Sequence, residues 1–457
     1  MKIFAIYIYG NKISQLSSKK TLPNFSSIPI GFTSVLTNIK KNGHYVNSGI
    51  ITKCTDINKF VVDNLFKTKY DMVCITSVTA HINTAKKTAK KIKDINKNIK
   101  IVIGGTHATL FADDIIKYKF FDAVCIGEGF QTIKVYLDYI QGKKESYEVN
   151  GFYIRENGKI IKNSFSEFTD FKKFPVIDRG IWDKHISDKN IHSVLVSRGC
   201  IHRCSFCVNH VFSKKNTGQY VGYRDIKDIL KEIDEIKKKY KNTKDIILES
   251  ETLTTNLPFT YKLLDSLTAY NGKLKNKLSF RINMSFNDLV KKDIRKFIYK
   301  VKKTNIICVN VGLESGSVRI RKEILKRPYY TNKDFISFCE ALKKHDIKLI
   351  ICVMIGIPSE TVSDLEKTID VVERIDPYSL NVSMFNLYPG TDICDFVMKK
   401  SGKNIRSAID CGYDIKSYGT LKNKKHVLKN VFKQLNNSYG MQKKRERLSL
   451  IDKIARQ

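Results

Sequence analysis

Apolar segments of strand length alternate with amphipathic segments along most of the 457 residues. Five apolar runs open the chain, and they read FAIYIY, YVNSGII, MVCITSV, IKIVIGG and AVCIG. Amphipathic segments follow them, beginning near Gly31, Asp56, Asn83, Leu110 and Gln131. This alternation is typical of α/β proteins and predicts a doubly wound parallel sheet over residues 1–145, with helices on both of its faces.

The alternation resumes at residue 191 with six further apolar runs. They read HSVLVS, DIILES, LSFRINM, IICVNVG, KLIICVMIG and SLNVSMF. Six strand and helix pairs predict a partial (β/α)6 barrel of the TIM type over residues 191–392, open on one side. In such barrels the active groups lie at the carboxyl ends of the strands.

Two segments fall outside these domains. Residues 146–190 form a predicted connector, which begins with a hairpin turning at Asn157-Gly158. Residues 393–457 form a predicted helical extension, which is basic and contains KKRER at 443–447.

Three cysteines directly follow the first strand of the second domain, at Cys200, Cys204 and Cys207. Three thiolates are one ligand short of a closed site, so this C-x3-C-x2-C spacing predicts an open four-iron cluster and identifies the three residues as both metal ligands and catalytic residues. The alternative is a zinc site completed by His202 or His210. The other eight cysteines show no metal spacing, which indicates free thiols in a reducing compartment.

The residues around the triplet resemble the cluster loop of the radical S-adenosylmethionine superfamily. The strand at 191–196 leads into Ser197-Arg198-Gly199, and Phe206 precedes the third cysteine. The resemblance implies a [4Fe-4S] cluster whose open iron holds S-adenosyl-L-methionine, with Phe206 beside the cofactor. It also implies cleavage to a 5′-deoxyadenosyl radical, supplied with electrons by a donor such as flavodoxin or ferredoxin.

The same resemblance implies contacts to S-adenosylmethionine from the strand ends. The implied residues are Glu249 and Glu251 for the methionyl ammonium, Arg281 and Asn283 for the carboxylate and ribose, Glu314 and Ser315 for ribose and methionine, and Gly356 for adenine. A carboxylate accepts a charge-assisted hydrogen bond from an ammonium group. The loop ESETLTTN departs from the glycine-rich or paired-aspartate form, so the division of roles between Glu249 and Glu251 stays open.

The strand-end loops of the first domain resemble those of the cobalamin-binding domain that precedes many radical S-adenosylmethionine enzymes. GGTHATLFADDII and IGEG carry the likeness, and a P-x-x-D-R linker follows at 175–179. The implied cobalamin-binding residues are Ser77, Thr79, Gly104, Gly105, Thr106, His107, Gly127 and Glu128. We expect the two adjacent glycines to let the backbone approach the flat macrocycle.

The loop after the first strand departs from the classical pattern. Residues 9–12 read YGNK and lack the D-x-H-x-x-G that supplies a lower histidine ligand, so we expect cobalamin in the base-off state without that histidine. The alternative is a doubly wound domain that has lost its ligand or binds another nucleotide. The absence of G-x-G-x-x-G argues against a dinucleotide.

The net charge of +36 would ordinarily suggest a nucleic-acid partner. Lysine is abundant throughout the chain, however, which indicates solvated helix faces, and we expect no nucleic-acid partner. No run of eighteen apolar residues and no signal peptide occurs, so we expect a cytoplasmic protein without a transmembrane segment.

These features together predict a cobalamin-dependent radical S-adenosylmethionine methyltransferase. The expected reaction is methylation of an unactivated carbon or of phosphorus in a small-molecule, lipid, peptide or natural-product substrate. Two alternatives stay open. One is a non-methylating enzyme that closes, rearranges or oxidises a ring with the same cofactors, and the other is an RNA-modifying protein.

Overall fold

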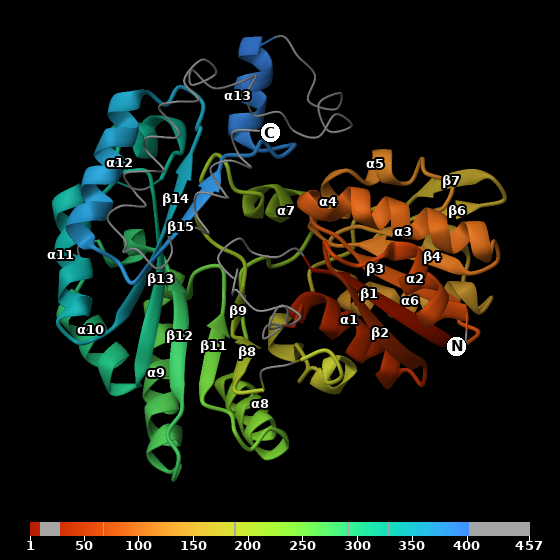
Figure 1. Ribbon diagram of the computed structural model, residues 1–457, viewed down its shortest axis with the longest axis horizontal. Helices are drawn as coiled ribbons and strands as arrows, with labels where there is room; N and C mark the ends of the chain where they lie inside the picture. The colour runs from red at the N-terminus through yellow and green to blue at the C-terminus, as the bar shows by residue number, and fades with distance from the viewer. Residues whose placement is uncertain (10–27, 67, 187–188, 291, 328, 402–457) are drawn as a thin grey trace. The chain divides into compact units, whose positions relative to one another are not determined.

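The computed structural model describes residues 1–9, 28–66, 68–186, 189–290, 292–327 and 329–401. The chain divides into two compact units (Figure 1). Unit 1 comprises Met1–Ser193 and Phe212–Arg224, and unit 2 comprises Val194–Val211 and Asp225–Gln457. The predicted loop at residues 10–12 and the predicted basic extension beyond residue 401 lie outside the described residues.

Unit 1 is built on a seven-stranded sheet in the order β2-β1-β3-β4-β5-β6-β7. The strands are β1 (Lys2–Ile8), β2 (Tyr45–Ile51), β3 (Met72–Thr76), β4 (Lys100–Gly104), β5 (Ala123–Cys125), β6 (Phe152–Glu156) and β7 (Lys159–Lys162). The first five pair in parallel, which confirms the predicted doubly wound sheet. The order 2-1-3-4-5 puts the reversal of strand order between β1 and β3, where ligands of such sheets bind.

Helices cover both faces of this sheet (Figure 1). They are α1 (Ile30–Lys41), α2 (Ile57–Val61), α3 (Ile82–Ile95), α4 (Thr106–Leu110), α5 (Ala112–Ile115) and α6 (Gly129–Ile140). Helix α3 shows why the pattern folds this way: Ile82, Ala85, Ala89 and Ile92 are buried at helical spacing, while Lys87 and Lys90 are exposed. Helices α1 and α6 pack together, and α2 packs with α3.

The predicted hairpin turns at Asn157 and Gly158, whose φ angles are 48° and 79°. Positive φ at both positions is the requirement of a tight type I′ turn. The hairpin is not a separate connector, because β6 pairs antiparallel with β5 and extends the sheet of unit 1.

Unit 2 contains a six-stranded sheet in the order β15-β14-β13-β12-β11-β8. The strands are β8 (Ile191–Leu195), β11 (Asp245–Glu249), β12 (Ser279–Met284), β13 (Ile306–Glu314), β14 (Lys348–Ile355) and β15 (Ser379–Met384). The pairs from β11 to β15 are parallel. This arrangement confirms the predicted partial barrel.

Five helices alternate with these strands, and further short elements flank them. The five are α8 (Ile226–Lys239), α9 (Leu257–Gly272), α10 (Ile294–Lys303), α11 (Asn332–Lys343) and α12 (Val362–Ile375). The flanking elements of unit 2 are β9 (Ser197–Arg198) and α13 (Asp392–Ser401), while α7 (Asn209–Lys215) crosses the boundary between the units and β10 (Gly222–Tyr223) belongs to unit 1.

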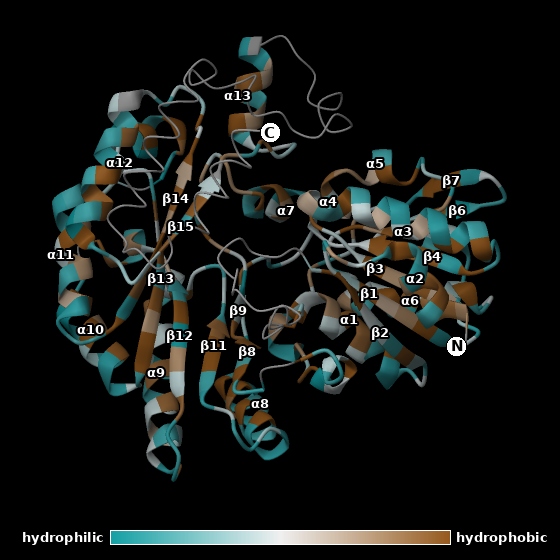
Figure 2. Ribbon diagram, viewed as in Figure 1, coloured by the Kyte–Doolittle hydropathy of each residue, from teal (hydrophilic) through white to brown (hydrophobic). Residues whose placement is uncertain are grey.

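The core of unit 2 lies between one face of the sheet and the helices. In β12, Phe280, Ile282 and Met284 are buried against this core, to which α9 contributes Leu263 and α10 contributes Phe297. Figure 2 shows the apolar strands of unit 2 inside the row of helices α10 to α12, whose ribbons combine hydrophilic and hydrophobic stretches. Because side chains alternate along a strand, the residues between the core positions lie on the opposite face of the sheet.

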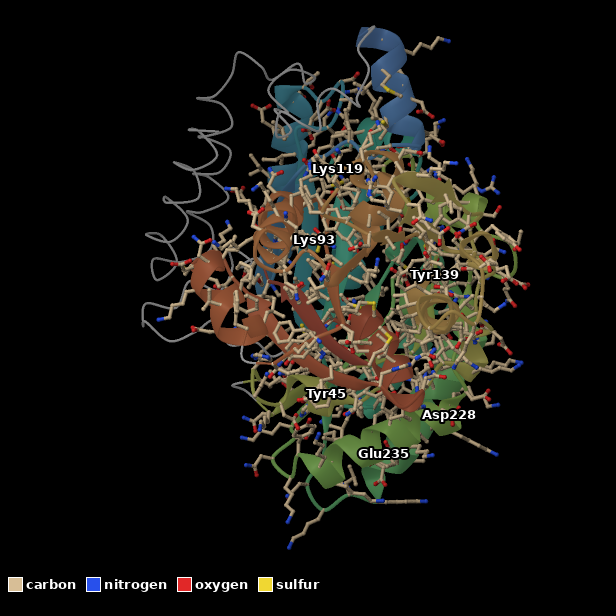
Figure 3. The ribbon with its side chains drawn as sticks, turned by 90° about the vertical axis from the view of Figure 1, so that its right-hand side faces the viewer. Tyr45, Lys93, Lys119, Tyr139, Asp228 and Glu235 are labelled. Carbon is tan, nitrogen blue, oxygen red and sulfur yellow. The ribbon has the colours of Figure 1, made fainter. Side chains whose placement is uncertain are left out.

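Charged side chains such as Lys119 and Glu235 are exposed and point into solvent (Figure 3). The exposure of Lys119 fits the expectation that lysine side chains lie on solvated surfaces. Within the described ranges, none of the helices has both the length and the apolar character that a membrane span requires.

Candidate functional site

The cysteine loop begins at Gly199, whose φ of 81° turns the chain after β9. Cys204 is buried, and Cys200 and Cys207 are half-buried. Burial raises the pKa of Cys200 to about 12 and that of Cys207 to about 11, and each of these thiols is close enough to neighbouring thiols to raise its pKa further. Such thiols deprotonate readily only when a metal centre supplies positive charge, so the donor set fits a bound metal cluster.

No three His, Cys, Asp or Glu side chains of the described residues converge as ligands of one metal ion. A four-iron cluster takes its thiolates on different irons and does not require such convergence. His202, a ligand in the zinc alternative, is engaged elsewhere, because its Nε2 lies 2.6 Å from Oδ1 of Asp288. His210 is buried, with its Nε2 3.6 Å from Oδ1 of Asp392.

Asp288 connects the cysteine loop to the ends of β11 and β12. Its second oxygen, Oδ2, accepts hydrogen bonds from Thr254 Oγ1 at 2.6 Å and from Thr252 Oγ1 at 3.3 Å. The backbone N–H of His202 in turn donates to Cys200 Sγ at 3.4 Å. The first thiol of the triplet is therefore linked through His202 and Asp288 to the loop that follows β11.

Glu251 also contacts the cysteine loop. Its Oε2 accepts a hydrogen bond from the backbone N–H of Gly199 at 2.9 Å, and its charge acts on Cys207. Glu249, the last residue of β11, is half-buried, and its carbonyl accepts from Val196 N at 2.9 Å. Glu251 therefore contacts the cysteine loop directly through its side chain.

Glu314 and Arg327 form a buried ion pair beside Cys204. Glu314 Oε1 lies 2.7 Å from Arg327 Nη1, and the two side chains are 16% and 7% exposed. Burial raises the pKa of Glu314, and the guanidinium of Arg327 opposes that rise. Both charges act on the Cys204 thiol. Arg327 Nε is buried and has no hydrogen-bond partner among the described residues, which leaves a donor for a bound group.

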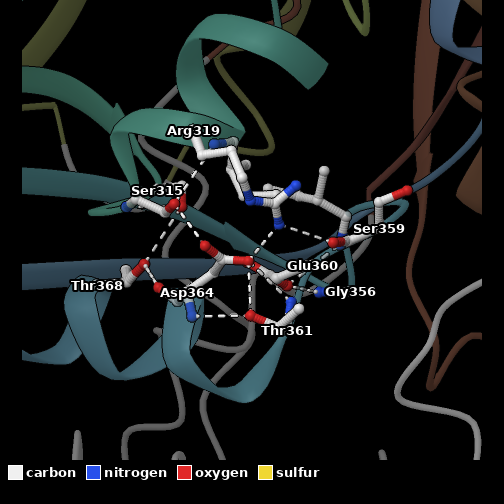
Figure 4. A network of polar contacts seen from close by, with 11 residues as sticks. Ser315, Arg319, Gly356, Ser359, Glu360, Thr361, Asp364 and Thr368 are labelled. Atoms are coloured by element: carbon white, nitrogen blue, oxygen red, sulfur yellow. Dashed lines mark hydrogen bonds and ion pairs between the residues drawn. The ribbon is translucent and has the colours of Figure 1, made fainter.

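Ser315 and Gly356 belong to a polar network at the ends of β13 and β14 (Figure 4). Ser315 is fully buried, and its Oγ lies 3.4 Å from Thr368 Oγ1. The backbone N–H of Gly356 donates to Glu360 Oε2 at 2.7 Å. The Ser315 hydroxyl is therefore used in a contact within the protein itself. Gly356 has a φ of 76°, a backbone conformation that glycine adopts without strain.

Arg281 does not join the residues around the cysteines. It lies in the middle of β12 and forms an ion pair with Asp245, the first residue of β11, at the amino end of that strand. Asn283 lies two residues further along, and its Oδ1 accepts a hydrogen bond from Asn310 Nδ2 of β13 at 3.1 Å. Phe206 packs against an apolar cluster that contains Leu325.

In unit 1 the loops after β3 and β4 meet tightly. Gly105 has a φ of 98°, and a Cβ at this position would lie 2.7 Å from the carbonyl oxygen of Ser77. A Cβ on Gly104 would lie 3.3 Å from that of Cys125. Gly105 is thus required for packing within the domain, Gly104 lies in a tight contact, and the expected approach of these glycines to the macrocycle stays a prediction.

His107 and Thr79 join the same two loops, with Nδ1 and Oγ1 3.1 Å apart. His107 follows Thr106, the first residue of α4, and stacks on Phe111 with ring centroids 4.5 Å apart. It is buried, and burial lowers its pKa to about 4, so the imidazole is neutral at pH 7. His107 is therefore a structural link rather than a surface residue.

The loop after β5 completes the group. The N–H of Gly127 donates to Thr109 Oγ1 at 3.1 Å, and Glu128 Oε2 accepts from the backbone N–H of Thr169 at 3.0 Å. A Cβ on Gly127 would lie 2.8 Å from Asn216 Nδ2. The structure thus gathers the predicted residues of unit 1 at one edge of the sheet, where the parallel strands end.

The sequence did not point to Asp288, Thr254 or Arg327. Asp288 and His202 are 86 positions apart, and no motif connects them. Arg327 lies closer in the sequence to its partner, Glu314. An arginine that follows a glutamate at the end of a strand is the signal that could have suggested this ion pair.

Two family models match the chain in the order of the two units. The B12 binding domain matches residues 23–137, and the Radical SAM superfamily matches residues 194–372. The two matches correspond to the parallel sheet of unit 1 and the partial barrel of unit 2.

Curated relatives include an uncharacterized methyltransferase of Pyrococcus horikoshii, which is 27% identical over 334 residues. That match covers 72% of this chain and 69% of the relative. The anaerobic magnesium-protoporphyrin IX monomethyl ester cyclase of Rubrivivax gelatinosus is 24% identical and is matched over 80% of this chain and 65% of its own length. The chain therefore spans about two thirds of these relatives.

Solved structures share the fold at lower identity. The radical S-adenosylmethionine methyltransferase TsrM from Kitasatospora setae, solved with cobalamin and a [4Fe-4S] cluster, gives a TM-score of 0.69 at 14% identity. The match covers 87% of this chain and 78% of TsrM. The cobalamin-dependent enzyme OxsB gives a TM-score of 0.65 at 16% identity, covering 93% of this chain and 57% of OxsB.

Proposed function

Because this chain belongs to the radical S-adenosylmethionine enzymes that carry a B12-binding domain, we propose that it methylates an unactivated carbon or phosphorus atom of its substrate. A [4Fe-4S] cluster, S-adenosylmethionine and cobalamin are its cofactors. When bound, they supply the electron that cleaves S-adenosylmethionine, the radical that activates the substrate, and the carrier of the methyl group.

Cys200, Cys204 and Cys207 would hold the cluster. Glu251 orients the start of the loop through Gly199, and His202 fixes the segment between the first two cysteines. The buried Glu314 and Arg327 place a fixed carboxylate and a fixed guanidinium next to the second thiol. A preorganised site of this kind binds a charged cofactor without reorganising its own dipoles.

The observation that carries the S-adenosylmethionine part of this proposal is the group of charges around the three thiols. Cys204 lies within electrostatic reach of Arg327, Glu314 and Asp288. A zwitterionic methionyl group presents an ammonium and a carboxylate, and Glu314 and the buried Nε of Arg327 offer an acceptor and a donor of matching charge. The arrangement therefore suits an amino acid moiety near the second cysteine.

The direct test is turnover of the full chain after anaerobic reconstitution. The protein should hold about four irons per chain and form 5′-deoxyadenosine on reduction. Each of Cys200→Ala, Cys204→Ala and Cys207→Ala should abolish that product, whereas Cys54→Ala, which alters an exposed cysteine of unit 1, should not. Stoichiometric zinc without a brown chromophore would contradict the proposal.

A second reaction class is favoured by one comparison, because a relative at 24% identity is named a monomethyl ester cyclase. Turnover with methyl-deuterated S-adenosylmethionine distinguishes methylation from cyclisation. Methylation predicts three deuteriums in the product and equal amounts of S-adenosylhomocysteine and 5′-deoxyadenosine, while cyclisation predicts an unlabelled product and no matched S-adenosylhomocysteine.

A further inference from the structure

A row of hydrogen-bonded side chains crosses the sheet of unit 2. Asn381 Nδ2 on β15 lies 3.7 Å from Cys352 Sγ on β14, and Cys352 Sγ lies 3.1 Å from Asn310 Oδ1 on β13. Asn310 Nδ2 then donates to Asn283 Oδ1 on β12 at 3.1 Å, and Asn283 Nδ2 donates to the carbonyl of Ser250 at 3.3 Å. The row thus extends from one edge strand to the residue that follows β11.

The row lies on the face of the sheet that points away from the helices. In β13, Val309 and Val311 enter the core shared with the helices, and Asn310 lies between them. Cys352 of β14 likewise lies between the core residues Ile351 and Val353. Asn283, Asn310 and Cys352 remain partly exposed, and Asn381 is exposed. These side chains are therefore not needed to build the core.

Asparagine is depleted in strands, because its side chain competes with the backbone and packs poorly on a pleated surface. Here Asn283 and Asn310 stand directly opposite each other on neighbouring strands, and Cys352 and Asn381 do so as well. Between β13 and β14 the row steps by two residues, because Asn310 pairs with Ile350 and Cys352 with Gly312. A local departure from strand preference that recurs on neighbouring strands is typical of a functional surface.

The chemistry of the row is neutral. An amide has two N–H donors and an oxygen with two lone pairs, and each asparagine donates one N–H within the row among the described contacts. The nearby Arg281 is neutralised by Asp245. A hydrocarbon placed here would leave polar groups without partners, and a carboxylate or phosphate would find no counter-charge in the row.

We propose that Asn283, Asn310 and Asn381, together with Cys352, bind an uncharged part of the substrate that carries an amide group, which gives Asn283 a role at the substrate in place of its implied contact with S-adenosylmethionine. An amide presents a donor and an acceptor side by side and so complements the remaining donors and acceptors of the row. This inference rests on the proposed function, and it narrows the substrate from the open set of small molecules, lipids and peptides to molecules with a neutral amide.

Cys352 provides a reporter within the row, because its thiol is half-buried. In the full chain reconstituted with its cofactors, the rate of Cys352 alkylation by N-ethylmaleimide would be followed by peptide mass spectrometry. The probes are N-acetylglycinamide, the acid N-acetylglycine, and toluene. At about twice its dissociation constant, the amide should slow alkylation about threefold, because only the unliganded fraction reacts. An N-acetylated dipeptide amide that protects at lower concentration would indicate a peptide substrate.

Asn310→Leu should remove the protection by the amide. Asn381→Leu should weaken it, and because Asn381 is exposed, this variant does not depend on tolerance of the core. Asn242→Leu, in the exposed turn between α8 and β11, is the matched control and should keep the protection. Equal protection by the acid or by toluene, no protection by the amide, or unchanged protection in both row variants would overturn the inference.

Failure of this inference is distinct from failure of the proposed function. Protection of Cys352 does not require turnover, and 5′-deoxyadenosine can be measured in the same preparations. A preparation that forms 5′-deoxyadenosine but shows no amide protection would overturn only the assignment of the row.

Discussion

His202 and Asp288 are joined side chain to side chain, with Nε2 and Oδ1 2.6 Å apart, although 86 positions separate them in the chain. The contact fastens the loop between Cys200 and Cys204 to the end of β12. Asp288 is 6% exposed and is itself held by Thr254. The fold therefore contributes contacts of its own that position the loop.

Replacing His202 by phenylalanine keeps the ring and removes this hydrogen bond. A hydrogen bond to a charged group contributes about 1.5–3 kcal/mol, and about 1.4 kcal/mol corresponds to a tenfold change. We expect the reconstituted His202→Phe protein to lose iron to a chelator about ten times faster than the unchanged protein. Arg203→Ala alters an exposed neighbour in the same loop and is the control. Equal release rates for both variants would show that the contact does not hold the loop.

Glu360 predicts a pH dependence of stability. The carboxyl is fully buried, and burial raises its pKa from 4.5 to about 7, although Gly356 and Ile357 donate backbone hydrogen bonds to it. The folded state therefore retains a proton that the unfolded state releases near pH 4.5. Retention of this proton stabilises the folded state relative to the unfolded state. That stabilisation is fully present below pH 4.5 and is lost as the pH rises through about 7.

A shift of this size corresponds to about 3 kcal/mol of unfolding free energy between pH 4.5 and 7. Glu360→Gln keeps an oxygen for the two backbone N–H groups and does not ionise. Urea unfolding from pH 5 to 8 should therefore show a flatter profile in the variant, with the largest gain relative to the unchanged protein at the alkaline end. The neighbouring charges of Asp364 and Arg319 remain in both proteins, so the difference between the profiles isolates Glu360.

The pair of Glu314 and Arg327 predicts a large cost for removing one partner. Arg327→Met leaves a buried carboxylate without its counter-charge, and we expect a loss of about 3 kcal/mol in unfolding free energy. Adding Glu314→Met should recover much of that loss, because no buried charge then remains. Lys322→Met, at an exposed position, is the control for the loss of a positive charge. Additive effects of the two substitutions in urea unfolding would contradict the coupling.

The sequence predicted the two sheets, because residues such as Phe280 and Ile282 reveal their strand by their alternation. The sequence could not predict the register between neighbouring strands, which decides how far along the sheet each residue lies. Arg281 was expected at the cofactor, yet its register opposite Cys308 and its pairing with Asp245 place it away from the strand ends. The sequence also could not predict long-range contacts such as the one between His202 and Asp288. These contacts depend on where the loops that follow β11 and β12 lie.

Gly105 tests whether the loops of unit 1 are set by internal packing. Gly105→Ala places a Cβ 2.7 Å from the Ser77 carbonyl at a φ of 98°, so the loop after β4 must move. Gly142→Ala is the matched control, because Gly142 also has a positive φ, of 72°, but nothing lies within 4 Å of its Cβ. The shared backbone strain costs about 1–3 kcal/mol in each, and the additional destabilisation of Gly105→Ala measures the contact. We expect Gly105→Ala to unfold at lower urea concentration than Gly142→Ala without any cobalamin present, and to bind hydroxocobalamin more weakly in a spectroscopic titration. Equal stabilities combined with weaker binding in Gly105→Ala alone would instead mean that this glycine faces the ligand.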